Sequence, residues 1–384
     1  MKLKRWMMRL ICFLMVFMFV SCCNSENSGT ADDSQQTTHS SLSPEFEMMA
    51  EYQEFLDTVS YLDYALTGEE TPCFVGRWFE KNINGVKHHV TLTDGSAFYF
   101  LIDGAESFDL NFTVITSKEE PYFAYSIDGA EPVRQRITNG KVDLPDSGKH
   151  TVRIIADGMT ESEGKWKDEK GFALKNVIPE KGGKIFGIRP QNKVIFYYGD
   201  SITEGVRALN MNANSNGNSA VNAYPWFCSE KLGAVTYSVG YGASGVTVAG
   251  SFNTFQNAID YYSLGRKVDD DVIPDVIVIN HGTNDRNVSA ETFKTELISS
   301  IRCLREKYPQ VPIVYMIPFI QSHAQTIEDV MRVFENTYIV QTDEWNLTYT
   351  DVFHPDPRGA KIAGENLAEE LIRIFGESFF QQRR

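Results

Sequence analysis

The chain of 384 residues is predicted to form an α/β domain with a doubly wound parallel sheet, preceded by a β-sandwich. From residue 194 onward, apolar runs alternate with helical patterns, which is typical of a parallel sheet with helices on both faces. Residues 74–188 instead contain short alternating segments between regular turn signals, as in a β-sandwich. Polar residues follow several of the later runs, at the sheet edge where doubly wound domains bind ligands.

The first 21 residues have the pattern of a signal peptide. The basic residues at its start are Lys2, Lys4, Arg5 and Arg9. The apolar run 10–20 that follows is short for a membrane-spanning helix. Ser21 before Cys22 resembles the bacterial lipobox, which implies cleavage before Cys22 and lipid attachment to it. A simple signal peptide with a chance cysteine is the alternative. We expect a lipid-anchored protein of the bacterial cell envelope, periplasmic or on the cell surface.

Two segments precede the predicted sandwich. Residues 22–45 are rich in Ser, Asn, Thr and Gln, cannot bury enough apolar surface to fold, and are interpreted as a flexible tether. Apolar side chains recur at helical spacing after that, so a helical segment is predicted over 46–70.

The β-sandwich is predicted over residues 72–190. Apolar and polar residues alternate strictly over 108–114 and more briefly over 152–154. Turns are expected at Asn-Gly and Asp-Gly pairs. These pairs begin at Asn84, Asp94, Asp103, Asp128, Asn139 and Asp157.

The parallel-sheet domain is predicted over residues 193–380. Its strands are expected at the apolar runs 194–198, 234–239, 276–280, 313–317 and, more weakly, 338–340. Ser289 is a candidate N-cap for the helix after the third run. A final amphipathic helix carries Ala360, Ala363, Leu367 and Leu371 on one face.

Charge and cysteine content argue against nucleic-acid binding and against a zinc site. The net charge of −15 disfavours nucleic acid, because phosphate binding needs surfaces of Lys and Arg. The cysteines outside the signal region are Cys73, Cys228 and Cys303, an odd number at long spacings. No Cys/His spacing of a zinc site occurs, so neither a metal nor another cofactor is predicted.

The candidate site combines the groups that acyl transfer requires. Ser201 follows the first predicted parallel strand, where a strand-to-helix turn exposes a nucleophile. His354, held off a helix by Pro355, is the candidate base, and Asp351 can orient its imidazole. Asn284 follows the third predicted strand and can donate to an oxyanion, together with backbone N–H groups of Ser201 and a glycine.

These residues lie in four blocks that resemble those of the SGNH (GDSL-type) hydrolases. The blocks are Gly199-Asp200-Ser201-Ile202-Thr203, Ser244-Gly245, Gly282-Thr283-Asn284-Asp285 and Asp351-x-x-His354-Pro355. The resemblance covers about residues 193–376 and implies a flavodoxin-like sheet. It implies Ser201, His354 and Asp351 as catalytic residues. It also implies Ser201, Gly245 and Asn284 as the oxyanion hole.

The preceding segment adds a second resemblance. A jelly-roll-like sandwich before such a domain, with the stretches 74–78 and 126–129, looks like carbohydrate esterase family 2. That resemblance implies removal of acetyl groups from plant polysaccharides, so an acetylated glycan is the expected substrate. The family often lacks a conventional acid, whereas Asp351 is present here.

Other residues near the blocks receive structural interpretations. Asp200 and Asp285 are expected to brace their loops, and His281 to be a packed residue. Trp345 is a candidate for stacking on a sugar, although aromatic residues at such positions are more often part of the core.

Two alternative functions remain open. A lipolytic SGNH esterase or thioesterase would need a long apolar groove, of which the polar stretch 208–223 gives no sign. A glycan-binding lipoprotein with a vestigial hydrolase domain would be expected to have lost parts of the Ser-His-Asp set.

Overall fold

The computed structural model describes residues 44–59, 61–269 and 271–384. The predicted signal peptide over 1–21, the predicted lipid attachment at Cys22 and residues 22–43 of the predicted tether lie outside these residues. Among the described residues, no helix has the length and apolar character needed to cross a membrane.

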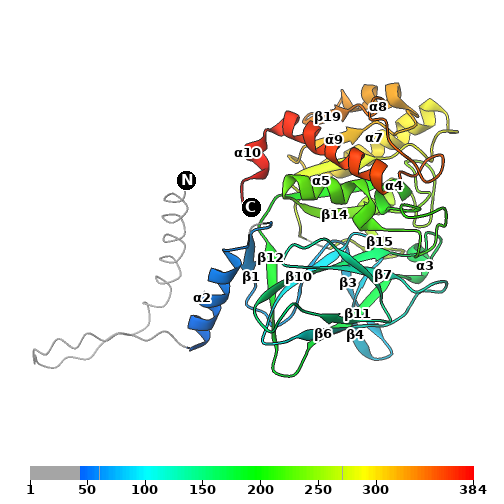
Figure 1. Cartoon of the computed structure of the whole chain (residues 1–384). Coiled ribbons are helices and arrows are strands. Elements are labelled where there is room, and N and C mark those ends of the chain that lie inside the picture. Colours follow the sequence, from blue (N-terminus) through cyan, green and yellow to red (C-terminus); the bar gives the residue numbers. More distant parts are fainter. Residues whose placement is uncertain (1–43, 60, 270) are drawn as a thin grey trace, which may run out of the picture. The chain divides into compact units, whose positions relative to one another are not determined.

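The first half of the described chain forms two antiparallel sheets (Figure 1). The larger sheet has the strand order β1-β12-β5-β10-β7-β8, with β2 also paired to β5. Its strands are β1 (Tyr64–Leu66), β2 (Cys73–Val75), β5 (Ala97–Asp103), β7 (Tyr122–Ile127), β8 (Val133–Arg136), β10 (His150–Gly158) and β12 (Lys184–Pro190). The smaller sheet, in the order β3-β4-β11-β6-β9, contains β3 (Trp78–Ile83), β4 (Val86–Thr91), β6 (Ser107–Phe112), β9 (Lys141–Asp143) and β11 (Phe172–Pro179).

The two antiparallel sheets share a hydrophobic core. Buried side chains of the larger sheet, such as Phe100 and Ile154, belong to the same cluster as Phe108 and Leu174 of the smaller sheet. The alternation predicted around residues 108–112 therefore corresponds to β6, whose apolar residues face this core. We call residues 64–190, with their two sheets, the sheet module.

Two predictions in this region are wrong. The helix α2 (Pro44–Leu56) ends well before residue 70, and β1 follows it. Leu62 and Tyr64 are both buried against the larger sheet, so the apolar spacing after Leu56 belongs to an extended segment. Asp157 was expected in a turn but lies within β10, where the pairing with β7 shifts at a bulge.

The second half contains a five-stranded parallel sheet in the order β14-β13-β17-β18-β19, with helices on both faces. Its strands are β13 (Val194–Gly199), β14 (Val235–Gly240), β17 (Val276–Asn280), β18 (Ile313–Met316) and β19 (Thr337–Val340). A separate hairpin consists of β15 (Tyr261–Ser263) and β16 (Arg266–Lys267). The five expected apolar runs therefore match the five parallel strands.

Alternate residues of β13 serve the two faces of this sheet. Ile195 and Tyr197 pack with helices α5 and α9, whereas Phe196 and Tyr198 pack with α6, α7 and α8. The helices of the described chain that follow α2 are α3 (Lys165–Asp168), α4 (Ser201–Glu204), the 3₁₀ helix η1 (Ala220–Asn222), α5 (Tyr224–Leu232), α6 (Phe255–Asp260), α7 (Ala290–Lys307), α8 (Ala324–Met331), α9 (Pro357–Phe375) and α10 (Glu377–Phe380). Ser289 caps α7 as expected, since its side chain accepts the N–H of Thr292.

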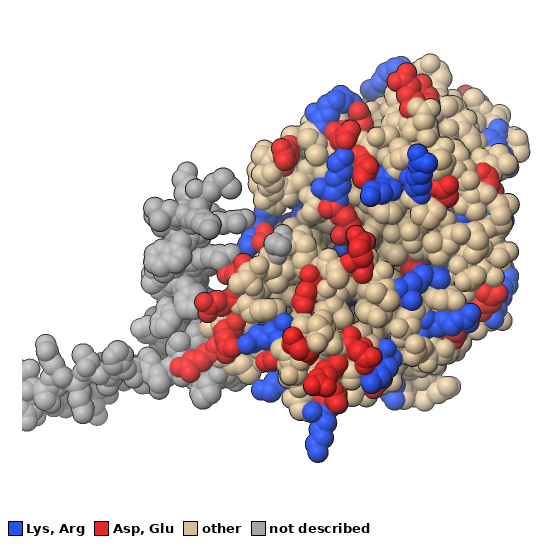
Figure 2. Space-filling view, in the orientation of Figure 1, with Lys and Arg blue, Asp and Glu red and all other residues tan. Residues whose placement is uncertain are grey.

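Charged side chains of both signs are mixed over the molecular face drawn in Figure 2. One buried ion pair joins the two halves of the chain. Lys165 of α3 pairs with Glu204 of α4, and both side chains are fully buried. Asp94, also buried, lies in the same cluster, and burial raises its pKa well above the usual value.

Candidate active site

Ser201 lies at the turn between β13 and α4, at the carboxyl end of the parallel sheet. The strand ends at Gly199, where any Cβ would overlap Thr203 Oγ1. Asp200 is the N-cap of α4, and its Oδ1 accepts the N–H of Ile202 at 2.9 Å. The sequence at this turn therefore fixes the backbone that presents the Ser201 hydroxyl.

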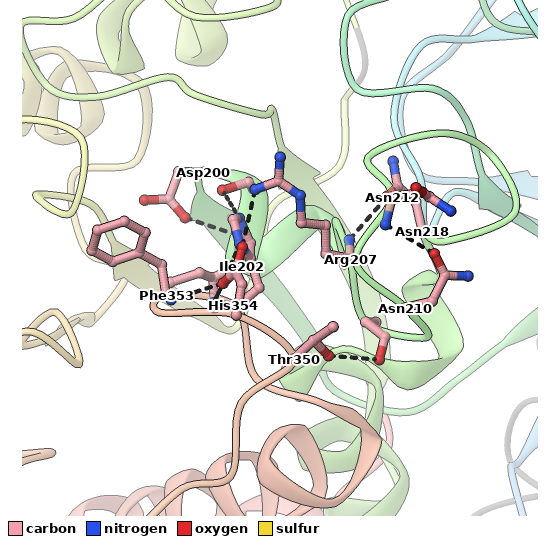
Figure 3. Close-up of polar contacts among 12 residues, drawn as sticks. Asp200, Ile202, Arg207, Asn210, Asn212, Asn218, Thr350, Phe353 and His354 are labelled. Carbon is pink, nitrogen blue, oxygen red and sulfur yellow. Dashed lines mark hydrogen bonds and ion pairs between the residues drawn. The ribbon is translucent and has the colours of Figure 1, made fainter.

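The structure brings Ser201, His354 and Asp351 together, as the sequence predicted. Figure 3 shows His354 beside Ile202, the residue that follows Ser201 in the chain. His354 Nε2 lies 2.8 Å from Ser201 Oγ. On the other side of the ring, Nδ1 lies 2.9 Å from Asp351 Oδ2 and 3.0 Å from Oδ1. This arrangement allows the imidazole to accept the hydroxyl proton while the carboxylate fixes its tautomer.

Asp351 is held by the backbone of its own loop. Its Oδ1 accepts the N–H groups of Phe353 at 2.8 Å and of His354 at 2.7 Å. Burial raises the pKa of Asp351, but these hydrogen bonds and the His354 ring outweigh burial and lower it well below its usual value. Asp351 is therefore a carboxylate throughout the physiological range.

Asn284 lies beside the nucleophile turn, directly after β17. Its Nδ2 donates to the Ser244 carbonyl at 2.9 Å and lies 3.4 Å from Asp200 Oδ2. The second contact is long for a hydrogen bond, so an oxyanion could replace it.

Gly245 was expected to donate its backbone N–H to the oxyanion, but this N–H has another partner in the structure. Its N–H donates to the Val248 carbonyl at 2.8 Å, so this group is already paired. A Cβ at this position would overlap the carboxylate of Asp285. The glycine is therefore required by packing, and its N–H could reach an oxyanion only after the bond to Val248 opens.

Asp285 and His281 occupy the structural positions expected for them. Asp285 accepts the N–H groups of Val246 at 2.9 Å and Thr247 at 2.8 Å, which shapes the loop around Gly245. His281 is buried and packs its ring 4.7 Å from that of Phe255. Burial lowers the pKa of His281 to about 4, so the ring is neutral.

Burial also determines the pKa of Asp200. It raises the pKa of this carboxyl group to about 7, against the hydrogen bond from Ile202, and the nearby Asp285 adds to the rise. Asp200 braces the turn, as expected from the sequence. Its protonation near neutral pH was not foreseen.

Arg207 was missed by the sequence analysis. Its Nη1 lies 3.0 Å from Asp351 Oδ2, on the side of the carboxylate away from the backbone donors. The two residues are 144 positions apart, and Arg207 belongs to none of the four blocks. An arginine six residues after the candidate nucleophile was the one available signal.

Trp345 packs against the core formed by α5 and α9, with its ring 6.0 Å from that of Phe319. A contact with the substrate stays a prediction. In the described part of the chain, no cluster of His, Cys, Asp and Glu side chains could hold a metal ion.

Comparison with known proteins agrees with this geometry. Residues 197–362 match the GDSL-like Lipase/Acylhydrolase family. This segment is a GDSL-like hydrolase domain. The match supports an ester hydrolase of the SGNH type. No curated protein sequence matches the chain.

Solved structures share the fold over most of this hydrolase. A family two carbohydrate esterase from Clostridium thermocellum, in complex with cellohexaose, is 19% identical over 80% of this chain and 99% of its own, with a TM-score of 0.64. An acetyl xylan esterase from the rumen bacterium Butyrivibrio proteoclasticus is 16% identical over 83% and 100%, with a TM-score of 0.62. A salicylyl-acyltransferase from a tetracycline biosynthetic pathway is 16% identical over 81% and 98%, with a TM-score of 0.59.

Proposed function

We propose that this hydrolase removes O-acetyl groups from a polysaccharide or oligosaccharide through an acyl-enzyme intermediate. The observation that carries the proposal is the linear set Ser201–His354–Asp351, with contacts of 2.8 and 2.9 Å. The carbohydrate esterases among the structural relatives support a glycan as the substrate.

The proposed reaction begins when His354 Nε2 takes the proton of Ser201 as Oγ attacks the acetyl carbonyl. Asp351 stabilises the imidazolium that forms. The tetrahedral intermediate collapses when His354 donates this proton to the departing sugar hydroxyl. Water then attacks the acetyl carbonyl of the acyl-enzyme while His354 takes its proton, and acetate leaves as the bond to Ser201 breaks and His354 returns the proton to Oγ.

The proposed oxyanion donors are the N–H of Ser201 and Nδ2 of Asn284. The N–H of Ser201 is in the first turn of α4, where no intrahelical acceptor exists for it. One hydrogen of the Asn284 amide is held by the Ser244 carbonyl, which orients the other toward Asp200 and the nucleophile turn. Gly245 joins this set if its loop opens on substrate binding.

We further propose that the sheet module is a jelly-roll-like β-sandwich. The shared core of its two antiparallel sheets supports this architecture. The mature protein would be attached to a membrane through lipid on Cys22, in the periplasm or on the cell surface. Fractionation and metabolic lipid labelling of Cys22→Ala test the anchor, which is rejected if the wild type takes up no label.

The test of function is acetate release from acetylated xylan, mannan, pectin and sialylated glycans, beside p-nitrophenyl esters from acetyl to octanoyl. Ser201→Ala is expected to abolish hydrolysis while thermal unfolding stays that of the wild type. Residual activity within about tenfold of the wild type would exclude Ser201 as the nucleophile, since triad removal costs orders of magnitude. Faster hydrolysis of octanoyl than of acetyl esters would favour the lipolytic alternative.

A further inference from the structure

Arg207 holds the side of Asp351 that the loop backbone leaves open. Asp351 Oδ1 accepts the two backbone N–H groups, whereas Oδ2 lies between Arg207 Nη1 at 3.0 Å and His354 Nδ1 at 2.9 Å. Figure 3 shows the Arg207 side chain extending toward Asp200 and Ile202. Only 34% of the arginine side chain is exposed, and 12% of the Asp351 side chain.

The backbone of Arg207 adopts a conformation that needs support. Its φ is 55°, in the left-handed region that side chains other than glycine rarely adopt. The N–H of Arg207 donates to Asn218 Oδ1 at 2.9 Å. Asn218 is fully buried, and its Nδ2 donates to the Met159 carbonyl at 2.7 Å. The conformation of Arg207 is therefore tied to the residue that follows β10 of the sheet module.

A second contact from the sheet module fixes the same asparagine. Arg134 of β8 donates through Nη2 to the carbonyls of Asn218 and Ser215. Arg134 is itself paired with Asp157 of β10, whose Oδ1 accepts Ser219 Oγ at 2.8 Å. The polar stretch 208–223, which had no assigned role in the sequence, is thus the segment that joins the sheet module to Arg207.

We propose that Arg207 is a positioning residue for Asp351, and that the sheet module sets its position through Asn218. The inference rests on the proposed serine esterase mechanism. It gives the sheet module a part in the reaction although no residue of that module belongs to the Ser-His-Asp set.

Arg207 has two separable effects on this set. Its Nη1 donates to Asp351 Oδ2 at 3.0 Å, and this charge-assisted contact keeps Oδ2 in line with the imidazole. Its positive charge also opposes the imidazolium form of His354. Removal of the guanidinium therefore lowers kcat through geometry and moves the acid limb of the pH–activity profile to higher pH through charge.

Other charged groups around His354 remain in any Arg207 variant. They are Asp200 and Glu161 near the nucleophile turn, Asp285 beside Asn284, and Arg286, whose guanidinium lies 4.8 Å from the Phe353 ring. Burial raises the pKa of Asp200 to about 7, so Asp200 titrates in the wild type and in each variant. Arg207→Lys keeps the positive charge and Arg207→Gln removes it, so the difference between the profiles of these two variants reports the loss of that charge.

The test compares Arg207→Gln and Arg207→Lys with the wild type on p-nitrophenyl acetate, with kcat, KM and full pH profiles. Arg207→Gln is expected to lower kcat about tenfold, to change KM less than about twofold, and to shift the acid limb upward. Arg207→Lys keeps the charge but not the planar guanidinium that places Nη1 against Asp351 Oδ2, so the acid limb stays in place while kcat recovers only partly.

The role of the sheet module is tested by a double-mutant cycle. Asn218→Ala is expected to lower kcat, and Arg207→Gln/Asn218→Ala to be no slower than Arg207→Gln, because the asparagine acts through the arginine. Arg134→Gln replaces Asn218→Ala if that variant does not fold. Arg136→Gln on the same strand, where Arg136 pairs with Glu120, is the control expected to keep wild-type kcat.

The outcomes separate this inference from the proposed function. A wild type that neither hydrolyses the ester nor reacts with a fluorophosphonate defeats the proposed function. An active wild type with unchanged kcat and pH profile in Arg207→Gln defeats the positioning role alone. Additive losses in the cycle defeat the link through Asn218.

Discussion

Asp351 distinguishes the proposed mechanism from one that uses only Ser201 and His354. Its two oxygens accept bonds from the loop backbone, the His354 ring and Arg207, so its charge and orientation are both fixed. The carboxylate is nearly buried, and both of its oxygens accept hydrogen bonds. A neutral side chain in its place would leave some of these donors without an acceptor, which is unfavourable.

Asp351→Asn is expected to lower kcat by up to about 10⁴, because an amide facing Nδ1 favours the wrong tautomer of His354. The measurement is kcat on p-nitrophenyl acetate at the optimum pH. Asp356→Asn is the matched control, since Asp356 caps α9 through Oδ1 and asparagine caps equally well. A loss below about tenfold in Asp351→Asn would mean that the enzyme works with Ser201 and His354 alone.

Asp200→Asn is expected to stabilise the protein at alkaline pH. Burial raises the pKa of Asp200 from 3.8 to about 7 on folding, so folding takes up a proton between these values. The stability contributed by Asp200 therefore falls as the pH rises from about 4 to about 7. Asparagine keeps the acceptor for Ile202 without this penalty, which amounts to at most about 4 kcal/mol at pH 8.

Urea unfolding at pH 4 and pH 8 measures this difference. The variant should match the wild type at pH 4 and exceed it at pH 8. Asp143→Asn, at a carboxylate whose side chain is 80% exposed, should show no such divergence. An equal effect of Asp200→Asn at both pH values would disprove the raised pKa.

Short elements position the residues of the candidate site, and the short helix α4 positions Ser201. It contains one turn, Ser201–Glu204, and is capped at its C-terminus by Gly205, whose φ is 88°. The Gly205 carbonyl accepts the N–H of Ser219 at 2.9 Å, so the end of α4 is attached to the 208–223 stretch. The helix end and the loop are therefore expected to move together.

Gly205→Ala should destabilise the fold more than Gly233→Ala. Both glycines end short helices with a positive φ, so each alanine costs about 1–2 kcal/mol for the left-handed conformation. At Gly205 the new Cβ would also overlap the Ser219 carbonyl, whereas at Gly233 nothing lies within 4 Å. Urea unfolding of the two variants measures the difference, and equal losses would show that the Ser219 contact carries no weight.

Elements with an unambiguous hydrophobic pattern could be predicted from the sequence, whereas the segment after Leu56 could not. The five parallel strands appear as continuous apolar runs because both faces are covered by helices. After Leu56, apolar residues at mixed spacings fit either a helix or an extended edge segment, and pairing of β1 with β12 decided the outcome.

Some features of the candidate site could also be predicted from the sequence, and others could not. The Asp351–His354 contact spans three positions and follows from local geometry, and the blocks place Ser201 and Asn284 at one sheet edge. The pairing of Gly245 with Val248 and the contact of Arg207 with Asp351 depend on loop conformations that no local pattern encodes. Sequence therefore predicts the reacting groups better than it predicts what holds them.

At the scale of the whole molecule, the buried pair of Lys165 and Glu204 connects the sheet module to the hydrolase domain. Burial alone would lower the pKa of Lys165, but the carboxyl groups of Glu204 and Asp94 raise it above its usual value. The lysine is therefore charged in the folded protein, and its charge stabilises the buried carboxylate of Glu204.

Lys165→Met should destabilise the protein by about 3–5 kcal/mol, because it leaves a buried carboxylate without its cation. The loss should be larger at pH 8 than at pH 5, since Glu204 can escape the penalty by taking up a proton. Lys231→Met, which removes a solvent-exposed partner of Glu369, should cost no more than about 1 kcal/mol. Comparable losses in the two variants, measured by urea unfolding, would show that the buried pair does not couple the two halves.

The position of Glu204 also bears on how such enzymes exchange parts during evolution. The hydrolase domain carries, three residues after Ser201, a carboxylate whose counter-ion is encoded in a different module. A recombination event that transferred residues 193–380 alone would bring the acid without the lysine and yield a domain that folds poorly. Single-domain relatives are therefore expected to have a neutral residue in place of Glu204, or a cation of their own beside it. The two modules of this chain should be inherited together.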